Sequence, residues 1–428
     1  MPPSNVFKRR AAYVKGNYPV NYFKQPNSDK PIEQIWEDID AYSGEFFPDE
    51  PQYYDKIDLI IPLPPLKYNG VFTKGILLTQ GAEHLLNLYP DLKKLFFVGA
   101  YTMWSSYSWC DKADLYFACY ENKPREIYHK NKYQNKKDII FIPLQDADYT
   151  NEYTMAPAFN VEREYDILSV ATPYEVKNHI MIAQAVKEYE KKYGKKLKVK
   201  FVLGKKDIKK NNDGKIDLKS ITDNPQRKII EAVYDIMGDN IPEIEPYIPH
   251  NDLNRCYSSA KCLVLASLIE GKNRSINEAL SCDTPVVVFK AHNQWARGEY
   301  PIFYGNSGEL ADEFTPDSLA DAMHKIIKNS QNYEPRKNYL MYNGRKNFIN
   351  TCAKYIPYYK ENIPDLSDNN IANNLWVDLA SQKLYQVSFL DFLYGKSPHI
   401  CWVQGMKRID FLIKYYYFMF GINQEENH

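Results

Sequence analysis

Two glutamates and the short cationic turn between them are the residues of this sequence whose types and spacing best suit a chemical task. Glu278 follows Glu270 by eight residues, and Lys272 and Arg274 lie between them. Two carboxylates at one site can accept hydrogen bonds from pairs of sugar or ribose hydroxyls. The backbone N–H groups of residues 272–275, together with the two cations, suit a diphosphate. These residue types therefore predict a site for a ligand that carries both hydroxyls and a diphosphate.

The surrounding elements place these residues at one edge of a sheet. Residues 261–266 form an apolar stretch of strand length, and residues 274–282 have the apolar spacing of a helix that Pro285 cannot continue. Gly271 allows a tight turn between them, and residues 285–289 form the next strand. The loop and the helix N-terminus then lie at the carboxyl end of a parallel strand, where open α/β sheets bind ligands.

The same stretch resembles a known family. The pattern is Glu270-Gly271, then six residues, then Glu-Ala-Leu-x-Cys-x-Thr-Pro-Val-Val beginning at Glu278. This pattern is similar to the signature of the group 1, glycogen-synthase-like family, whose members are retaining glycosyltransferases that use nucleotide sugars. The resemblance implies an α/β chain of GT-B architecture, in which two Rossmann-like doubly wound domains face each other across a cleft. It also implies transfer of a sugar from a nucleoside diphosphate to a glycan or lipid-linked acceptor, without a metal ion or other cofactor.

The resemblance assigns roles to residues of two loops. Lys177, after the strand expected at 166–170, matches a family lysine that contacts the sugar donor's diphosphate, whereas the family's arginine is replaced by Ala171 or Thr172. Lys272 or Arg274 substitutes for it under our hypothesis. Catalytic roles fall on Glu270, near the sugar hydroxyls, and Lys177. The residues expected to bind the sugar donor are Gly204, Lys205, Gly271, Lys272, Asn273, Arg274, Ser275 and Glu278, the last on the ribose hydroxyls.

Each of these assignments has a plainer alternative. A glutamate on a helix such as Glu278 is often solvated, and a lone loop lysine such as Lys177 is often solvated too. His250 lies where the resembling family borders the nucleotide base, but it also precedes Asn251 and Asp252, which can cap a helix. Relatives carry a histidine after the strand expected at 95–99, and this chain has none there.

Length and composition set broader limits. With 428 residues, two domains are expected, and 54 basic against 54 acidic residues give no electrostatic case for nucleic acid. Seven cysteines without CxxC spacing indicate reduced thiols in a cytoplasmic protein. We expect an N-terminal extension, an acceptor domain, a nucleotide-sugar domain and C-terminal helices that return to the first domain, at 1–55, 56–160, 161–333 and 334–428.

Several further stretches carry local predictions. In the first domain we expect strands at 56–62, 95–99, 113–118 and 138–142 and a helix over 76–88. Asp146 and Asp148 indicate a turn and no metal site, and residues 211–217 a hairpin turn and no calcium loop. The apolar tail at 408–421 either docks on its own protein or touches a membrane surface peripherally.

Three classes of function stay open at this point. The first is a glycosyltransferase of polysaccharide biosynthesis. The second is a GT-B epimerase or phosphorylase, although a phosphorylase needs a longer chain and a pyridoxal phosphate. The third is a nucleotide-sugar-binding protein that has lost activity, which the missing arginine and histidine favour. Nucleotide release from candidate sugar donors, with and without acceptor, distinguishes them.

Overall fold

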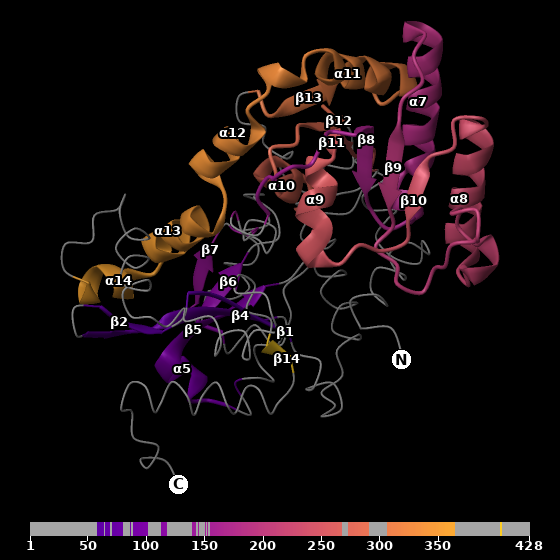
Figure 1. Cartoon of the computed structure of the whole chain (residues 1–428). Helices are drawn as coiled ribbons and strands as arrows, with labels where there is room; N and C mark the ends of the chain where they lie inside the picture. The colour runs from indigo at the N-terminus through magenta and orange to yellow at the C-terminus, as the bar shows by residue number, and fades with distance from the viewer. Residues whose placement is uncertain are drawn as a thin grey trace, which may run out of the picture. The chain divides into compact units, whose positions relative to one another are not determined.

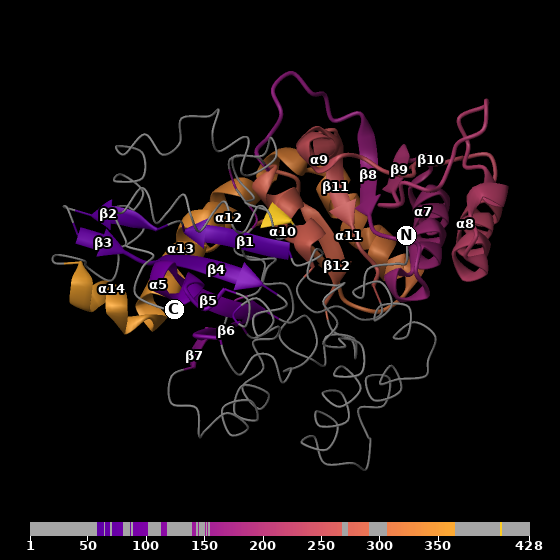
Figure 2. The ribbon, with the colours of Figure 1, turned by 90° about the horizontal axis from the view of Figure 1, so that it is seen from below.

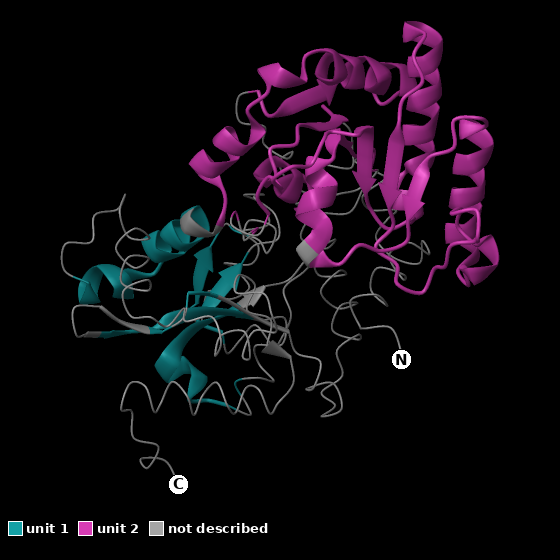
Figure 3. Cartoon of the chain, in the orientation of Figure 1, with its two compact units in different colours: residues 1–5, 29–149, 345–428 teal, residues 6–28, 150–344 magenta. Residues whose placement is uncertain are grey.

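The structure is a computed structural model, and the two compact units into which it divides are coloured in Figure 3. The described part of the first unit comes from residues 58–144 and 345–404, and that of the second from 150–344. The described residues are 58–63, 65–68, 71–79, 86, 89–101, 113–117, 139–142, 144, 150, 152, 155–267, 273–290, 306–363 and 403–404. Among the predictions, those for the N-terminal extension, Asp146, Asp148, Glu270, Gly271, Lys272 and the tail at 408–421 lie outside them.

The first unit contains a six-stranded sheet in the order β14-β1-β4-β5-β6-β7 (Figures 1 and 2). The strands from β4 to β7 are parallel, whereas β1 is antiparallel to both of its neighbours. A hairpin of β2 (Leu66–Tyr68) and β3 (Val71–Thr73) and the short helix α5 (Leu92–Leu95) accompany it. The six strands are β1 (Asp58–Leu63), β4 (Gly75–Thr79), β5 (Phe96–Tyr101), β6 (Leu115–Phe117), β7 (Ile140–Ile142) and β14 (Val403–Gln404).

The helix expected over 76–88 is wrong in its first part, because β4 occupies Gly75–Thr79. Ile76, Leu77 and Leu78 are all fully buried in this central strand. A short run that is apolar at every position does not distinguish a buried strand from a buried helix. Gly75 begins β4, and a Cβ there would clash with the Leu63 carbonyl on the neighbouring strand.

Two helices from the far end of the chain close the core of the first unit. α13 (Arg345–Tyr355) and α14 (Pro357–Asn362) pack on its sheet. The Phe348 ring stacks on Phe117 with centroids 5.9 Å apart, and the Tyr359 hydroxyl donates to the Lys74 carbonyl at 2.7 Å. The apolar residues of this core are Leu63, Ile76, Leu78, Leu115, Phe117, Ile142, Phe348, Ile349, Cys352, Ala353, Ile356, Tyr359 and Ile363.

The second unit contains a fully parallel sheet in the order β10-β9-β8-β11-β12-β13. Counted along the chain within this unit, the order is 3-2-1-4-5-6, which is that of a Rossmann sheet. The strand prediction at 261–266 is confirmed by β11, whereas β13 is a strand that the sequence does not predict. The strands are β8 (Tyr165–Val170), β9 (Val199–Val202), β10 (Glu243–Glu245), β11 (Ala260–Val264), β12 (Val286–Phe289) and β13 (Gly308–Ala311).

Helices cover both faces of this sheet (Figure 1). α7, α8 and α11 pack on the face to which Ile167 of β8 points, and α9, α10 and α12 on the face of Leu168. The alternation of side chains along a strand produces these two layers. The helices are α7 (His179–Tyr193), α8 (Asn224–Met237), α9 (Leu253–Ser258), α10 (Arg274–Ser281), α11 (Pro316–Lys328) and α12 (Pro335–Tyr342). The expected pair of Rossmann-like α/β units is therefore confirmed.

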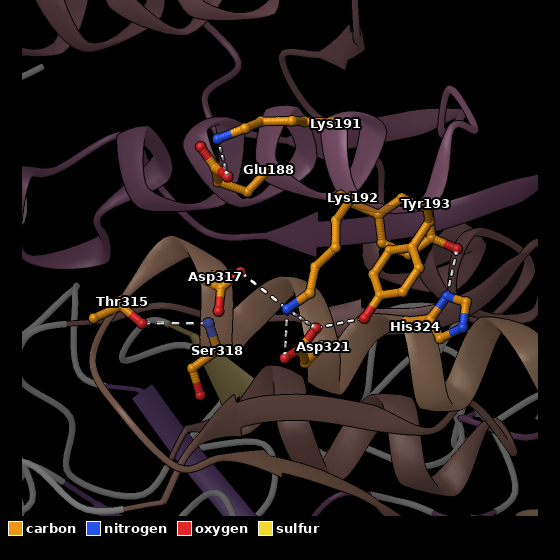
Figure 4. Close-up of polar contacts among 10 residues, drawn as sticks. Glu188, Lys191, Lys192, Tyr193, Thr315, Asp317, Ser318, Asp321 and His324 are labelled. Atoms are coloured by element: carbon orange, nitrogen blue, oxygen red, sulfur yellow. Dashed lines mark hydrogen bonds and ion pairs between the residues drawn. The ribbon is translucent and has the colours of Figure 1, made fainter.

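Polar contacts join α7 to α11 on the outer surface of the second unit (Figure 4). Lys192 forms ion pairs with Asp317 at 3.0 Å and Asp321 at 2.7 Å. The Tyr193 hydroxyl donates to Asp321, and the Tyr193 ring stacks on His324 with centroids 3.7 Å apart. We call these five residues the α7–α11 clamp.

The two segments at which the chain enters and leaves the second unit are bonded to each other within it. The Arg336 guanidinium on α12 donates to the carbonyls of Glu152 at 2.9 Å and Met155 at 3.3 Å. The Tyr339 hydroxyl donates to the Thr150 carbonyl at 3.0 Å. The structure places the change of unit at 149/150 and 344/345, whereas the sequence suggests 160/161 and 333/334. None of the described helices has the length and apolar character needed to cross a membrane.

Candidate functional site

The candidate site lies where the strand order of the second sheet reverses, between β8 and β11. Ligands of open α/β sheets bind outside the carboxyl ends of the strands at such a point. Two contacts tie neighbouring elements to the end of β8. The Ser275 hydroxyl on α10 donates to the Val170 carbonyl at 3.1 Å, and His179 Nε2 on α7 lies 3.1 Å from the Ala171 carbonyl. The N-termini of two helices therefore meet at one strand end.

The α10 N-terminus is capped by the side chain of Asn273, whose amide oxygen accepts from the Ser275 N–H at 2.8 Å. The Asn273 side chain is nearly buried. The expectation that the Ser275 N–H is free for a diphosphate is therefore wrong, because the cap already occupies it. Arg274 is the first helical residue, as predicted from the spacing of 274–282.

Glu278, in the second turn of α10, is a buried carboxylate. Its side chain is only 6% exposed, so the alternative of a solvated helix residue is wrong. The Tyr257 hydroxyl on α9 donates to Glu278 Oε2 at 2.7 Å. Burial, and then the negative charge of Glu278, raise the pKa of Tyr257 well above its ordinary value, so Tyr257 remains a hydrogen-bond donor.

His250 comes from a short 3-10 turn, η6 (His250–Asp252), that precedes α9. Its Nε2 lies 3.6 Å from Glu278 Oε1, and its side chain is 37% exposed. The alternative for His250 is that it only precedes a helix cap. Asp252 does not support this alternative, because its side chain makes no cap hydrogen bond at the start of α9. The structure therefore brings His250 to the predicted carboxylate, and it adds Tyr257, which the sequence does not single out.

The loop between β8 and α7 carries Lys177, which ends the 3-10 turn η4 (Glu175–Lys177). Asn178 follows in the left-handed region, with φ of 51°, and His179 begins α7. His179 is completely buried, and burial, with a smaller effect of the Lys177 charge, lowers its pKa to about 4. The neutral ring therefore uses its Nε2–H on the Ala171 carbonyl, which fixes the backbone of the Lys177 loop.

Gly204 and Lys205, after β9, lie beside the same loop. Gly204 has φ of +65°, and a Cβ there would meet the Thr172 hydroxyl at 3.8 Å. The Lys205 N–H donates to the Pro246 carbonyl at 2.6 Å, and its ammonium lies 5.3 Å from the centre of the Tyr174 ring. Lys205 thus adds a cation to the edge that holds Lys177.

The structure therefore gathers the described members of the predicted set at one edge of the second sheet. These are Lys177, Gly204, Lys205, Asn273, Arg274, Ser275 and Glu278. Among the described residues, no group of three His, Cys, Asp or Glu side chains is arranged to hold a metal ion. His179 and Tyr257 are the members that sequence reasoning missed, since each acts through a partner that the tertiary fold supplies.

Residues 152–347 match the family model described as "Glycosyl transferases group 1". No curated protein matches the sequence. Similar solved structures include S. aureus TarM in complex with fondaparinux, alpha-GlcNAc-glycerol and UDP, at 14% identity and a TM-score of 0.41, covering 71% of this chain and 54% of that one. The sucrose-phosphate synthase of Thermosynechococcus elongatus has 14% identity and a TM-score of 0.40, with 72% and 78% covered. The N-terminal domain of Candida albicans trehalose-6-phosphate phosphatase has 12% identity and a TM-score of 0.44, with 81% of each chain covered. The match thus spans about half the length of TarM.

Proposed function

We propose that the protein is a retaining glycosyltransferase, since residues 152–347 match the family model of the group 1 glycosyl transferases. It transfers a sugar from a nucleoside diphosphate to a glycan or lipid-linked acceptor. The observation that carries this proposal is the buried Glu278 carboxylate, held by Tyr257 at the strand-order reversal of a Rossmann sheet. A buried carboxylate requires hydrogen-bond donors, and ribose hydroxyls are donors of the right kind at a nucleotide edge.

In this proposal, the two sides of the site hold different parts of the sugar donor. Glu278 binds the ribose, and Lys177 and Arg274 bind the diphosphate from the loop after β8 and the start of α10. Lys272 adds a cation to the diphosphate, and Glu270 binds the sugar hydroxyls near the reacting carbon. Lys272 and Arg274 take the place of the arginine that the family carries in the β8–α7 loop, and Lys205, whose ammonium approaches Tyr174 of that loop, adds a further cation.

Catalysis is then mainly electrostatic. The bond between the anomeric carbon and the diphosphate oxygen breaks while the carbon gains oxocarbenium character. Lys177 and its neighbouring cations stabilise the negative charge that develops on the departing diphosphate, which needs no metal ion. The departing phosphate takes the proton of the acceptor hydroxyl as the new bond forms on the same face, which retains the anomeric configuration.

A thermal-shift comparison of UDP, GDP and ADP tests the nucleotide part of the proposal. A ligand that binds the folded chain raises its melting temperature, and we expect one of the three nucleotides to do so more than the others. Nucleotide release from the corresponding sugar donors, with and without an added acceptor, tests the transfer. Release that requires the acceptor supports a transferase, conversion of the sugar without any acceptor indicates an epimerase, and binding without either indicates an inactive nucleotide-sugar-binding protein.

A further inference from the structure

We propose that His250 binds the donor nucleotide directly and, together with Glu278, recognises the two adjacent hydroxyls of its ribose. In the same proposal Tyr257 positions the Glu278 carboxylate for that contact. The proposal rests on the proposed function and deepens it, because it assigns the selection of ribonucleotides over deoxyribonucleotides to a pair of side chains from two different elements.

The first step of the inference is that one oxygen of Glu278 is already occupied. The fully buried Tyr257 donates its hydroxyl to Oε2 at 2.7 Å. An ionised carboxylate only accepts hydrogen bonds. The Tyr257 contact therefore orients the carboxylate, and a ligand that reaches Glu278 meets Oε1.

The second step is that Oε1 lies beside a group that is accessible from outside. His250 Nε2 is 3.6 Å from Oε1, which is longer than the roughly 3.2 Å limit of an ordinary N–H···O hydrogen bond. The Glu278 side chain is 6% exposed and that of His250 is 37% exposed, so the pair has one buried and one accessible member.

The third step is the match between the pair and a vicinal diol. The two hydroxyls of a ribose lie on adjacent carbons, and Oε1 and Nε2 are 3.6 Å apart, so each of these two atoms can contact one hydroxyl of the pair. One hydroxyl can donate to the Glu278 carboxylate while the other donates to the unprotonated nitrogen of a neutral imidazole, or accepts from its N–H. His250 thus offers the second hydroxyl a partner of its own beside the Glu278 carboxylate.

The local chain path explains why these residues meet. η6 and α9 are consecutive, so one segment carries both His250 and Tyr257, and it lies against α10, which carries Glu278. His250 is on the accessible side of the carboxylate and Tyr257 on the buried side. The segment thus presents a positioning residue and a ligand-contacting residue to the two oxygens of one side chain.

The test uses the full-length chain and whichever of UDP, GDP or ADP stabilises it most, with the 2′-deoxy and 3′-deoxy forms of that nucleotide. We expect wild type to bind the ribonucleotide about tenfold or more tightly than at least one deoxy form, since a hydrogen bond to a charged group contributes about 1.5 to 3 kcal/mol. His250→Ala should bind the ribonucleotide more weakly and discriminate less than about threefold against that deoxy form. Asp252→Ala, on the same 3-10 turn, is the matched control and should keep wild-type discrimination.

Tyr257→Phe tests the positioning role. It should weaken ribonucleotide binding and reduce discrimination against the deoxy forms, while kcat with saturating sugar donor changes less than KM does. If the Tyr257→Phe variant does not fold, the variants His250→Ala and His250→Gln still test the proposal, since His250 is half-exposed.

The outcomes separate this proposal from the proposed function. If wild type binds none of the three nucleotides, both are wrong. If wild type binds a nucleotide but does not discriminate against either deoxy form, the placement of the ribose at both His250 and Glu278 is overturned. If His250→Ala discriminates as wild type does, only the His250 assignment is overturned. Loss of discrimination in His250→Ala with an unchanged melting temperature of the ligand-free variant supports it, since a structural residue would alter the latter.

Discussion

Lys177 is the cation whose loop the surrounding structure holds most firmly. The turn η4 ends at it, and His179 fixes the Ala171 carbonyl just before that turn. If Lys177 stabilises charge that develops on the departing diphosphate, Lys177→Met should lower kcat by roughly 30- to 1000-fold, which corresponds to about 2 to 4 kcal/mol. Lys187→Met, an α7 residue paired with Glu190, is the control for the loss of a surface lysine. Turnover that is unchanged in Lys177→Met would exclude this role.

Glu278 should act on binding more than on turnover. Glu278→Gln keeps the size of the side chain and its neighbour Tyr257 but removes the charge. We expect the nucleotide to bind about 10- to 100-fold more weakly, since a hydrogen bond to a charged group contributes about 1.5 to 3 kcal/mol. Calorimetric titration measures the change. Glu188→Gln, on the outer surface of α7, should bind as wild type does, and equal affinities for all three proteins would contradict the placement of the ribose.

His179 predicts how stability depends on pH. Burial holds its pKa at about 4 in the folded chain, against 6.5 for an ordinary histidine. Above pH 6.5 the ring is neutral in both states. As the pH falls from 6.5 towards 4, His179 becomes protonated in the unfolded chain but stays neutral in the folded chain. The free energy of unfolding therefore decreases, by about 3 kcal/mol in total.

Urea unfolding at several pH values between 7.5 and about 4.5, above most carboxylate titration, measures this loss for the second unit. His179→Gln retains an N–H for the Ala171 carbonyl and removes the titrating ring. Its free energy of unfolding should be lower at neutral pH and should fall less steeply towards acid. The same slope in both proteins would show that His179 is not the group responsible.

At the scale of elements, the α7–α11 clamp is a set of surface contacts centred on one carboxylate. Asp321 accepts from both Lys192 and Tyr193, whereas Asp317 contacts Lys192 and is more exposed. Asp321→Asn should therefore lower the free energy of unfolding of the second unit by about 0.5 to 1 kcal/mol, and Asp317→Asn by less. Thermal unfolding at low and high salt provides the measurement, with a smaller difference at high salt. Equal effects of the two substitutions would contradict the central role of Asp321.

Helices and strands were predictable where a regular spacing of apolar residues ended at a residue that terminates the element. The apolar strand at 261–266 and the helix from Arg274, stopped before Pro285, lie close to where the sequence places them. The pattern failed at Ile76–Leu78, because a strand buried on both faces has no polar position to reveal its period. It also missed β13 (Gly308–Ala311), whose half-buried residues pair only with β12 at the sheet edge.

The candidate site was predictable in part for a related reason. Lys177 and Glu278 are visible because they occupy motif positions. Tyr257 is 21 residues from Glu278, and its burial against that carboxylate follows from how α9 packs on α10. Likewise, nothing local in the sequence shows that His179 is buried, because Phe201 and the end of β8 surround it only in the folded sheet.

At the scale of the whole molecule, the described part of the second unit lies within a single stretch of the chain, 150–344, whereas that of the first comes from two stretches. We therefore expect the fragment 150–344 to unfold cooperatively on its own. Phe348→Ala, in the α13 core of the first unit, should destabilise only that unit, by about 3 to 5 kcal/mol. Differential scanning calorimetry of the full chain checks this, since one transition should move and the other should match that of the isolated fragment. A fragment without a cooperative transition would contradict the independence of the second unit.

The pairing of β1 with β14 and the packing of α13 on the first sheet have a consequence for biosynthesis. Domains usually fold in the order in which they leave the ribosome. Here the strands made first lack the helices that cover them until residues 345–363 have been translated, by which time the segment 150–344 is already complete. The segment 150–344 thus matures first, and the first unit lacks α13 and α14 in the meantime, which makes it the part most in need of a chaperone.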